Sequence, residues 1–198
     1  MRYWATAAVL TACGTAAFIG WTQHDRPQVR RSEQIVPPSS RIVYPAGRLP
    51  VLTLPDGQKQ VIHSLLNVAK PMRYGDYRWD DKGVPAGPTW IRVDLARQTL
   101  SLFRAGHEIG SAVILYGTDG KPTPHGVFPI LEKAREHRST LYDAEMPYML
   151  RLTGDGVAVH ASDVRYGRAT HGCVGVPPAF ARLLFEQVKR RDPVAITA

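Results

Sequence analysis

Glycine and proline recur throughout this chain and limit the folds that it can adopt. The 198 residues include 17 Gly and 16 Pro. Glycine loses much backbone entropy in a helix, and proline lacks the N–H group that a helix interior needs. The content therefore favours a loop-rich fold built from β-strands over a helical bundle. The length suffices for one compact domain with a core and some additional sequence.

Alternating apolar and polar residues in the second half of the chain predict the strands. Two turns, Ala96–Gln98 and Gly154–Gly156, connect neighbouring segments and predict two β-hairpins. The expected strands are 89–94, 99–104, 108–116, 127–131, 148–152, 157–160 and 194–197.

A single long helix is expected near the C-terminus. It begins at Pro177 or Pro178, since proline is acceptable in a first turn. Apolar residues share one helical face. Lys189–Arg191 are expected in the last turn, where the helix dipole favours cations. The apolar residues of that face are Phe180, Leu183, Leu184 and Val188.

Residues 51–88 form a lead-in segment that is expected to pack on the next domain. The pattern predicts a strand at 51–54, followed by a turn at Pro55–Gly57. Residues 61–68 (VIHSLLNV) are expected to form a short helix. The rest of this segment is turn-rich.

The N-terminal segment predicts export. Residues 3–21 carry no charge, and the length of this segment is close to the roughly 20 residues that span a bilayer. We expect 1–22 to be a signal sequence or membrane-anchor helix, and prefer an uncleaved anchor. Leu10-Thr11-Ala12-Cys13 resembles a bacterial lipobox, so a lipoprotein signal is the alternative, and a buried core helix is a third. The Pro-rich stretch 23–50 then reads as an extended linker.

The charge balance allows several partners. A formal net charge of +8 fits nucleic acid, an anionic membrane or an acidic polymer. The basic runs, Arg30-Arg31 and Lys189–Arg191, are short and read as solvated surface. No zinc-finger or RNA-binding signature is present, so no nucleic-acid partner is expected.

A cysteine and two histidines carry the chemistry. The chain has two cysteines, and Cys13 lies in the apolar N-terminal segment, so Cys173 is a single thiol in the main domain. A thiol needs a base to become a nucleophile. His160 ends a predicted strand and is the favoured general base, while His171 supports the loop or tunes the thiol. Gly172 and the amides around Cys173 are suited to an oxyanion site.

Two other interpretations of these residues stay open on chemistry alone. In the first, Cys173 is a buried structural cysteine beside histidines whose hydrogen bonds are satisfied. Alternatively, His160, His171 and Cys173 bind zinc with a fourth ligand from His125, His137 or an acidic residue. Their spacing matches neither a Cys-x-x-Cys nor a His-x-x-x-His pair, which disfavours the metal site.

Several segments resemble one enzyme family. Thr170-His171-Gly172-Cys173, preceded by a histidine at a strand end, resembles the signature of the L,D-transpeptidase catalytic domain (YkuD-type). The similarity covers 89–198, which we take as the catalytic domain. Upstream segments resemble the family in the same order: 90–102 its opening hairpin, 122–128 its Thr-Pro-x-Gly-x-Phe loop, and 146–160 the approach to the histidine.

The resemblance implies a mostly β, twisted β-sandwich-like fold with one main C-terminal helix. It implies a cysteine-dependent acyltransferase that forms 3→3 cross-links between peptidoglycan stem peptides, through a thioester on Cys173 with His160 as base. No metal or organic cofactor is needed, and carbapenems are expected to acylate Cys173. We expect a bacterial cell-envelope location on the periplasmic side, anchored by the N-terminal segment or secreted. Thr170, His171 and Gly172 are the expected supporting and oxyanion residues.

The resemblance leaves other functions open. The alternatives are an L,D-carboxypeptidase, attachment of a protein to the wall on the same site, or a non-catalytic wall-binding module. Three features depart from the family pattern: Gly175 replaces the usual Arg or Asn, Ala161 replaces a common glycine, and the loop 160–171 is short. Arg151, Arg165 and Arg168 are the candidates to supply a positive charge in place of a side chain at position 175. Tyr142 and Tyr148 are candidate cleft residues, and aromatic core packing is the alternative role for each.

Overall fold

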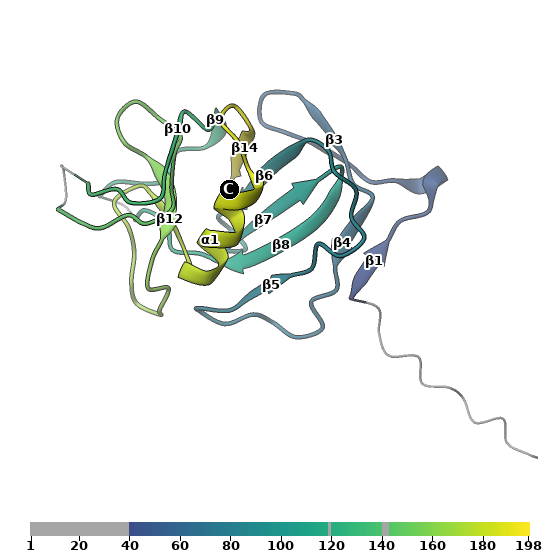
Figure 1. Ribbon diagram of the computed structural model, residues 1–198, viewed down its shortest axis with the longest axis horizontal. Helices are drawn as coiled ribbons and strands as arrows, with labels where there is room; N and C mark the ends of the chain where they lie inside the picture. Colours follow the sequence, from purple (N-terminus) through teal and green to yellow (C-terminus); the bar gives the residue numbers. More distant parts are fainter. Residues whose placement is uncertain (1–39, 119, 140–142) are drawn as a thin grey trace, which may run out of the picture. The chain divides into compact units, whose positions relative to one another are not determined.

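The computed structural model describes residues 40–118, 120–139 and 143–198. Within them, a large and a small β-sheet and one α-helix form the domain (Figure 1). The large sheet has the spatial order β1 (Arg41–Val43), β4 (Ser64–Leu66), β8 (His107–Val113), β7 (Thr99–Arg104), β6 (Thr89–Asp94), β14 (Pro193–Thr197) and β9 (Gly126–Pro129), with β5 (Tyr77–Trp79) also paired to β8.

The small sheet carries the segments that the sequence marks as reactive. Its order is β10 (Glu132–Ala134), β11 (Met149–Arg151), β12 (Ala158–Ala161) and β13 (Val174–Val176). The remaining elements are the β2–β3 hairpin (Val51–Thr53 and Lys59–Val61), a short 3-10 helix η1 (Ala46–Arg48) and the helix α1 (Pro178–Gln187). The described part of the chain is therefore mostly β with one C-terminal helix, as expected.

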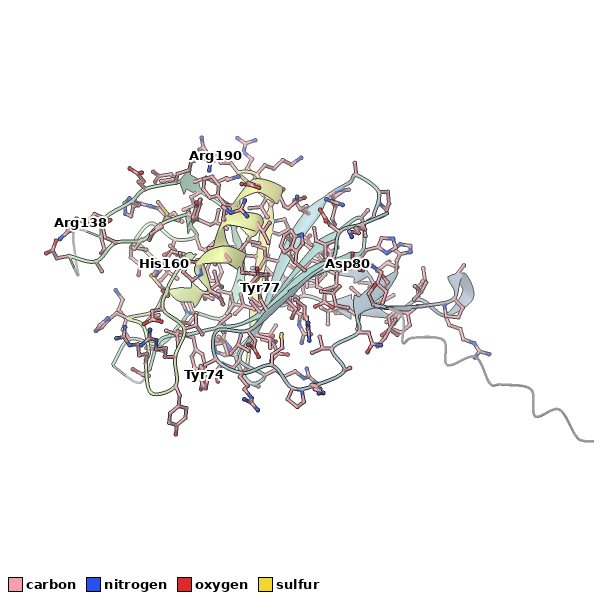
Figure 2. The ribbon with its side chains drawn as sticks, turned by 60° about the horizontal axis from the view of Figure 1, so that its bottom comes forward. Tyr74, Tyr77, Asp80, Arg138, His160 and Arg190 are labelled. Atoms are coloured by element: carbon pink, nitrogen blue, oxygen red, sulfur yellow. The ribbon has the colours of Figure 1, made fainter. Side chains whose placement is uncertain are left out.

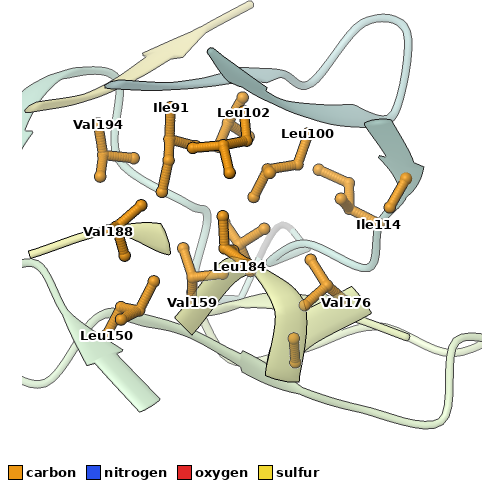
Figure 3. Packing of buried hydrophobic residues seen from close by; sticks show 14 of the residues in the cluster. Ile91, Leu100, Leu102, Ile114, Leu150, Val159, Val176, Leu184, Val188 and Val194 are labelled. Atoms are coloured by element: carbon orange, nitrogen blue, oxygen red, sulfur yellow. The ribbon is translucent and has the colours of Figure 1, made fainter. Parts of the chain in front are cut away.

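The hydrophobic core joins both sheets through α1. Leu184 and Val188 lie between Ile91 of the large sheet and Leu150 and Val159 of the small sheet (Figure 3). All five side chains are buried. Burying one such side chain contributes about 1.5–3 kcal/mol, so this layer holds the small sheet in place.

The predicted hairpins and strands are present with small shifts. β6 and β7 pair antiparallel across the expected turn, and β11 and β12 do the same. The strand expected at 108–116 ends earlier, at Val113. It ends because Leu115 exchanges two backbone hydrogen bonds with Gly175, at 2.8 and 2.9 Å, which draws the chain toward the small sheet.

The helix begins as predicted and ends early. Pro178 lies in its first turn, but α1 stops at Gln187 and Val188 is already extended. The expectation that Lys189–Arg191 occupy the last turn is therefore wrong. The Lys133 ammonium donates hydrogen bonds to the carbonyl oxygens of Phe185 and Val188, and so satisfies helix-end acceptors from another element.

The lead-in segment adds strands to the large sheet. The helix expected at 61–68 is wrong, because this stretch ends β3 and forms β4, which pairs with β1 and β8. β4 is also held by Glu108, whose carboxylate accepts the N–H of Leu66 at 2.9 Å. Part of the expected linker, 41–43, is β1.

The expected anchor 1–22 and Cys13 lie outside the described residues. In the part of the chain that is described, no helix is long and apolar enough to cross a membrane.

Candidate active site

The parallel pairing of β12 with β13 brings His160 and Cys173 into one site. In the register of these strands, His160 lies opposite Gly175, and Cys173 directly precedes β13. Both residues line a cavity of about 640 Å³. Figure 2 shows His160 beside α1, the helix that packs on β12. The two predicted reactive residues are therefore adjacent in the fold, although 12 residues separate them in the chain.

The turn before Cys173 is fixed by local contacts. Thr170 forms an isolated parallel β-bridge with Gly117, and its N–H donates to Tyr116 O at 3.0 Å. Its hydroxyl donates to the carbonyl oxygen of Cys173 at 2.5 Å. Gly172 has φ +97°, a conformation that side-chain-bearing residues rarely adopt. Glycine at this position thus lets the chain turn sharply into β13. His171 lines the same cavity.

The surroundings of His160 favour a neutral imidazole with its proton on Nδ1. Its Nδ1 lies 2.9 Å from the carbonyl oxygen of Ala161. A carbonyl only accepts, so this contact assigns the proton to Nδ1 and leaves Nε2 free to accept one. Burial lowers the pKa of His160, the Ala161 contact opposes this, and His137 lowers it further. The net lowering favours the unprotonated imidazole at neutral pH.

Cys173 is a protonated thiol in this environment. Burial raises its pKa, while a backbone hydrogen bond from Ala158 and the charge of Lys121 oppose the increase and Asp155 adds to it. Its Sγ donates a hydrogen bond to Gly156 O at 3.7 Å. Transfer of the thiol proton to His160 would therefore require the thiol to rotate away from Gly156. Hydrogen bonds between a nucleophile and its base often form only once substrate is bound.

Charges of both signs line the cavity. Arg151 pairs with Glu132 at 3.2 Å, and Arg168 lies 3.8 Å from Asp163. Both arginines line the cavity, whereas Arg165 does not and pairs with Asp163 at 2.7 Å. Of the three arginines considered as substitutes for a charge at position 175, Arg151 and Arg168 are thus placed at the site.

The two candidate cleft tyrosines have different outcomes. Tyr148 packs edge-on against Phe185, with ring centroids 5.8 Å apart, and contacts the main core. It is not among the residues that line the cavity. Tyr142 lies outside the described residues.

Several residues that line the cavity were not predicted from the sequence. Met146 and Met149 pack beside Cys173. Lys121, Asp155 and Ser162 also line the cavity. Asp155 was visible in the predicted turn before His160, and Ser162 stands two positions after His160. Lys121 carried no signal, because only the tertiary fold brings its loop against Gly172.

The zinc alternative is not assembled in the residues described. Among them, no group of three or more His, Cys, Asp or Glu side chains is placed to hold one metal ion.

Comparisons with known proteins agree with this architecture. The sequence model of the L,D-transpeptidase catalytic domain, YkuD, matches residues 88–196. No curated protein sequence matched the chain.

Solved structures show the same fold. An L,D-transpeptidase from Stackebrandtia nassauensis is 25% identical, with a TM-score of 0.53 over 58% of this chain and 57% of that one. A cysteine-to-serine mutant of the Enterococcus faecium L,D-transpeptidase is 27% identical, with a TM-score of 0.52 over 57% of this chain and 50% of that one.

A third structure, an L,D-transpeptidase in complex with imipenem, is 24% identical, with a TM-score of 0.51 over 55% of this chain and 58% of that one, and supports the fold alone. This chain thus spans between half and three fifths of the length of these structures. The family match covers more than half of the chain, and the chain belongs to the L,D-transpeptidase catalytic domain (YkuD) family.

Proposed function

We propose that the protein is a cell-envelope L,D-transpeptidase that forms 3→3 cross-links in peptidoglycan, with Cys173 as nucleophile and His160 as general base. The observation that carries the proposal is the shared cavity. Within a fold of this family, the imidazole of His160 on β12 and the thiol of Cys173, directly before the parallel strand β13, line one pocket. A binding module has no chemical need for this pair.

The proposed reaction has two acyl-transfer steps. Nε2 of His160 takes the thiol proton as Sγ of Cys173 attacks the carbonyl carbon between an L-centre and a terminal D-alanine. The C–N bond breaks, His160 returns the proton to the departing amine, and a thioester remains. An amine of a second stem peptide then attacks the thioester, and His160 transfers its proton to the leaving sulfur. Backbone N–H groups of the Gly172–Cys173 turn are the proposed oxyanion donors.

The substrate and location belong to the same proposal. The formal charge of +8 suits an anionic wall polymer. An N-terminal anchor or signal would place the catalytic domain on the periplasmic side of the membrane, where peptidoglycan stem peptides are the donor and acceptor. Attack by water instead of an amine would make the enzyme an L,D-carboxypeptidase.

Product analysis tests the reaction. The full-length protein in mild detergent would be incubated with disaccharide-tetrapeptide, beside a Cys173→Ala control, and the products identified by mass spectrometry. We expect 3→3-linked dimers with the wild-type protein and none with the control. Tripeptide without dimer would replace the transpeptidase by a carboxypeptidase. No product and no covalent adduct would favour a wall-binding module.

A β-lactam provides a second, substrate-independent readout. One similar structure was solved in complex with imipenem. We expect imipenem to add its mass to the peptide that contains Cys173, and to leave the Cys173→Ala protein unmodified. Labelling that persists in the Ala variant would place the reactive group elsewhere.

A further inference from the structure

A serine and a glycine lie against the proposed base. His160 and Ser162 alternate along one chain segment, so their side chains point to the same face. Gly175 is the register partner of His160 in the neighbouring parallel strand. A side chain at position 175 would therefore project beside His160 and Ser162, on the side of the cavity.

The space at Gly175 is already filled by Ser162. A Cβ atom at position 175 would lie 2.6 Å from Oγ and 2.8 Å from Cβ of Ser162, and 3.4 Å from Cβ of Leu115. Distances below 3.0 Å are not tolerated between such atoms, so either the serine or the strand would have to move.

The backbone allows little such movement. Gly175 exchanges two hydrogen bonds with Leu115, at 2.8 and 2.9 Å. The N–H of Ser162 donates to Val176 O at 2.8 Å. The segments that contain Leu115 and Ser162 are thus both hydrogen-bonded to β13. A larger residue at position 175 would therefore displace the serine side chain rather than the backbone.

The serine hydroxyl faces the ring nitrogen that is not the proposed base. Ser162 Oγ lies 3.4 Å from Nδ1 of His160, which also contacts Ala161 O at 2.9 Å. Nδ1–H therefore has two oxygen acceptors, the carbonyl being the stronger. When His160 takes a proton, positive charge develops in a desolvated site, where acceptors at Nδ1 stabilise it.

We propose that Ser162 is a positioning residue that holds the His160 ring with Nδ1 protonated and Nε2 free, and that Gly175 is required because it leaves room for the serine. The inference rests on the proposed function only in naming His160 as the base. It also gives a structural reason for Gly175, which departs from the family pattern described above.

Two readouts test the proposal without any wall substrate. One is the tautomer of His160, read from ¹⁵N NMR of the full-length protein in detergent. The other is the pH profile of Cys173 alkylation by iodoacetamide, followed by mass spectrometry of the Cys173 peptide so that Cys13 does not interfere. The variants are Ser162→Ala, Ser162→Thr, Gly175→Ala and the double variant Ser162→Gly/Gly175→Ala.

We expect Ser162→Ala to increase the Nε2–H tautomer of His160 and to slow alkylation about 3- to 10-fold, as for loss of one modest hydrogen bond. Ser162→Thr keeps the hydroxyl and should retain most of the rate. Gly175→Ala should act like Ser162→Ala by pushing the hydroxyl away. The Gly175 change should cost less in the Ser162→Gly background, where the clash is removed.

Wild-type tautomer and pH profile in Ser162→Ala would overturn the proposal, and so would strictly additive effects in the double variant. Melting curves check that each variant folds. If Gly175→Ala does not fold, the comparison of Ser162→Ala with Ser162→Thr decides the test. The failure of this inference is distinct from failure of the proposed function. If the wild-type protein forms dimers and Ser162→Ala leaves the tautomer and alkylation unchanged, only the role of Ser162 is contradicted. If Ser162→Ala alters the tautomer and alkylation but the wild-type protein forms no dimer, only the proposed function is contradicted.

Discussion

The hydroxyl of Thr170 donates a 2.5 Å hydrogen bond to the carbonyl oxygen of Cys173. This contact closes the turn through Gly172 and orients the peptide plane that follows the thiol. Because the N–H of Thr170 donates to Tyr116 O at 3.0 Å, the turn is also fixed to the segment that follows β8. The hydroxyl of Thr170 therefore helps to position Cys173.

Thr170→Val removes this hydroxyl at nearly constant shape. We expect imipenem to acylate Cys173 about 3- to 10-fold more slowly, because an ordinary hydrogen bond contributes about 0.5–1.5 kcal/mol. Thr170→Ser retains the donor and is the matched control. The rate would be measured by intact-protein mass spectrometry. An unchanged rate in the valine variant would show that the turn holds without the hydroxyl.

The pH profile of Cys173 alkylation distinguishes a neutral thiol–imidazole pair from a preformed ion pair. Burial raises the pKa of Cys173 and lowers that of His160. At neutral pH the thiol is therefore protonated and the imidazole neutral. We expect iodoacetamide labelling to increase through a midpoint above the usual thiol pKa of about 8.5. A midpoint below about 7 would instead indicate a thiolate–imidazolium pair in the resting enzyme.

The parts of the fold that the sequence predicted well depend on local pattern. The β6–β7 hairpin is fixed by the alternation at Leu100 and Leu102 and by a turn in which Gln98 has φ 56°. The mistaken helix at 61–68 shows the limit of this approach. Its apolar run is compatible with either state, and pairing of Ser64–Leu66 with strands distant in sequence decides the outcome.

The candidate site likewise contains residues that the sequence predicted and residues that only the fold brings together. Cys173 and His160, which line one cavity, were predicted as candidates because their residue types and order carry chemical meaning. Ser162 and Lys121 acquire a role only through contacts with residues distant in the chain. Position 175 likewise read as a lost contact in the sequence, whereas the structure shows its missing side chain replaced by Ser162.

Lys121 is expected to tune the thiol. A Cβ atom at Gly172 would lie 3.6 Å from Cγ of Lys121, so the lysine stem runs beside the residue before Cys173. Burial raises the pKa of Cys173, and the Lys121 charge partly offsets it, while Asp155 acts in the opposite direction.

Lys121→Met should shift the midpoint of Cys173 alkylation to higher pH, and Asp155→Asn should shift it to lower pH. Lys121→Arg keeps the charge and serves as the control. Shifts of the same sign in the Met and Asn variants would contradict an electrostatic origin, since the two charges oppose each other.

Asp94 is expected to stabilise the β6–β7 hairpin in a pH-dependent manner. This buried carboxylate accepts the backbone N–H of Arg97 at 2.9 Å and pairs with Arg92 and Arg97 at 2.8 and 3.0 Å. Burial raises its pKa, but the hydrogen bonds and charges of Arg97 and Arg92 outweigh burial and lower it overall. The folded state therefore binds the proton less readily than the unfolded chain. The stabilisation is present above the unfolded pKa of about 3.9 and is lost as the pH falls through the lower folded value.

Asp94→Asn should lower the free energy of unfolding at pH 7 by about 1–3 kcal/mol, because charged hydrogen bonds in a buried site are removed. The difference between wild type and variant should shrink as the pH falls below about 4. Urea denaturation at pH 7 and at pH 3 measures both values. Asp163→Asn removes an exposed carboxylate that pairs with Arg165, so it should cost less than about 1 kcal/mol and controls for the loss of charge. Equal losses in the two variants would mean that burial of Asp94 adds nothing to its pairing.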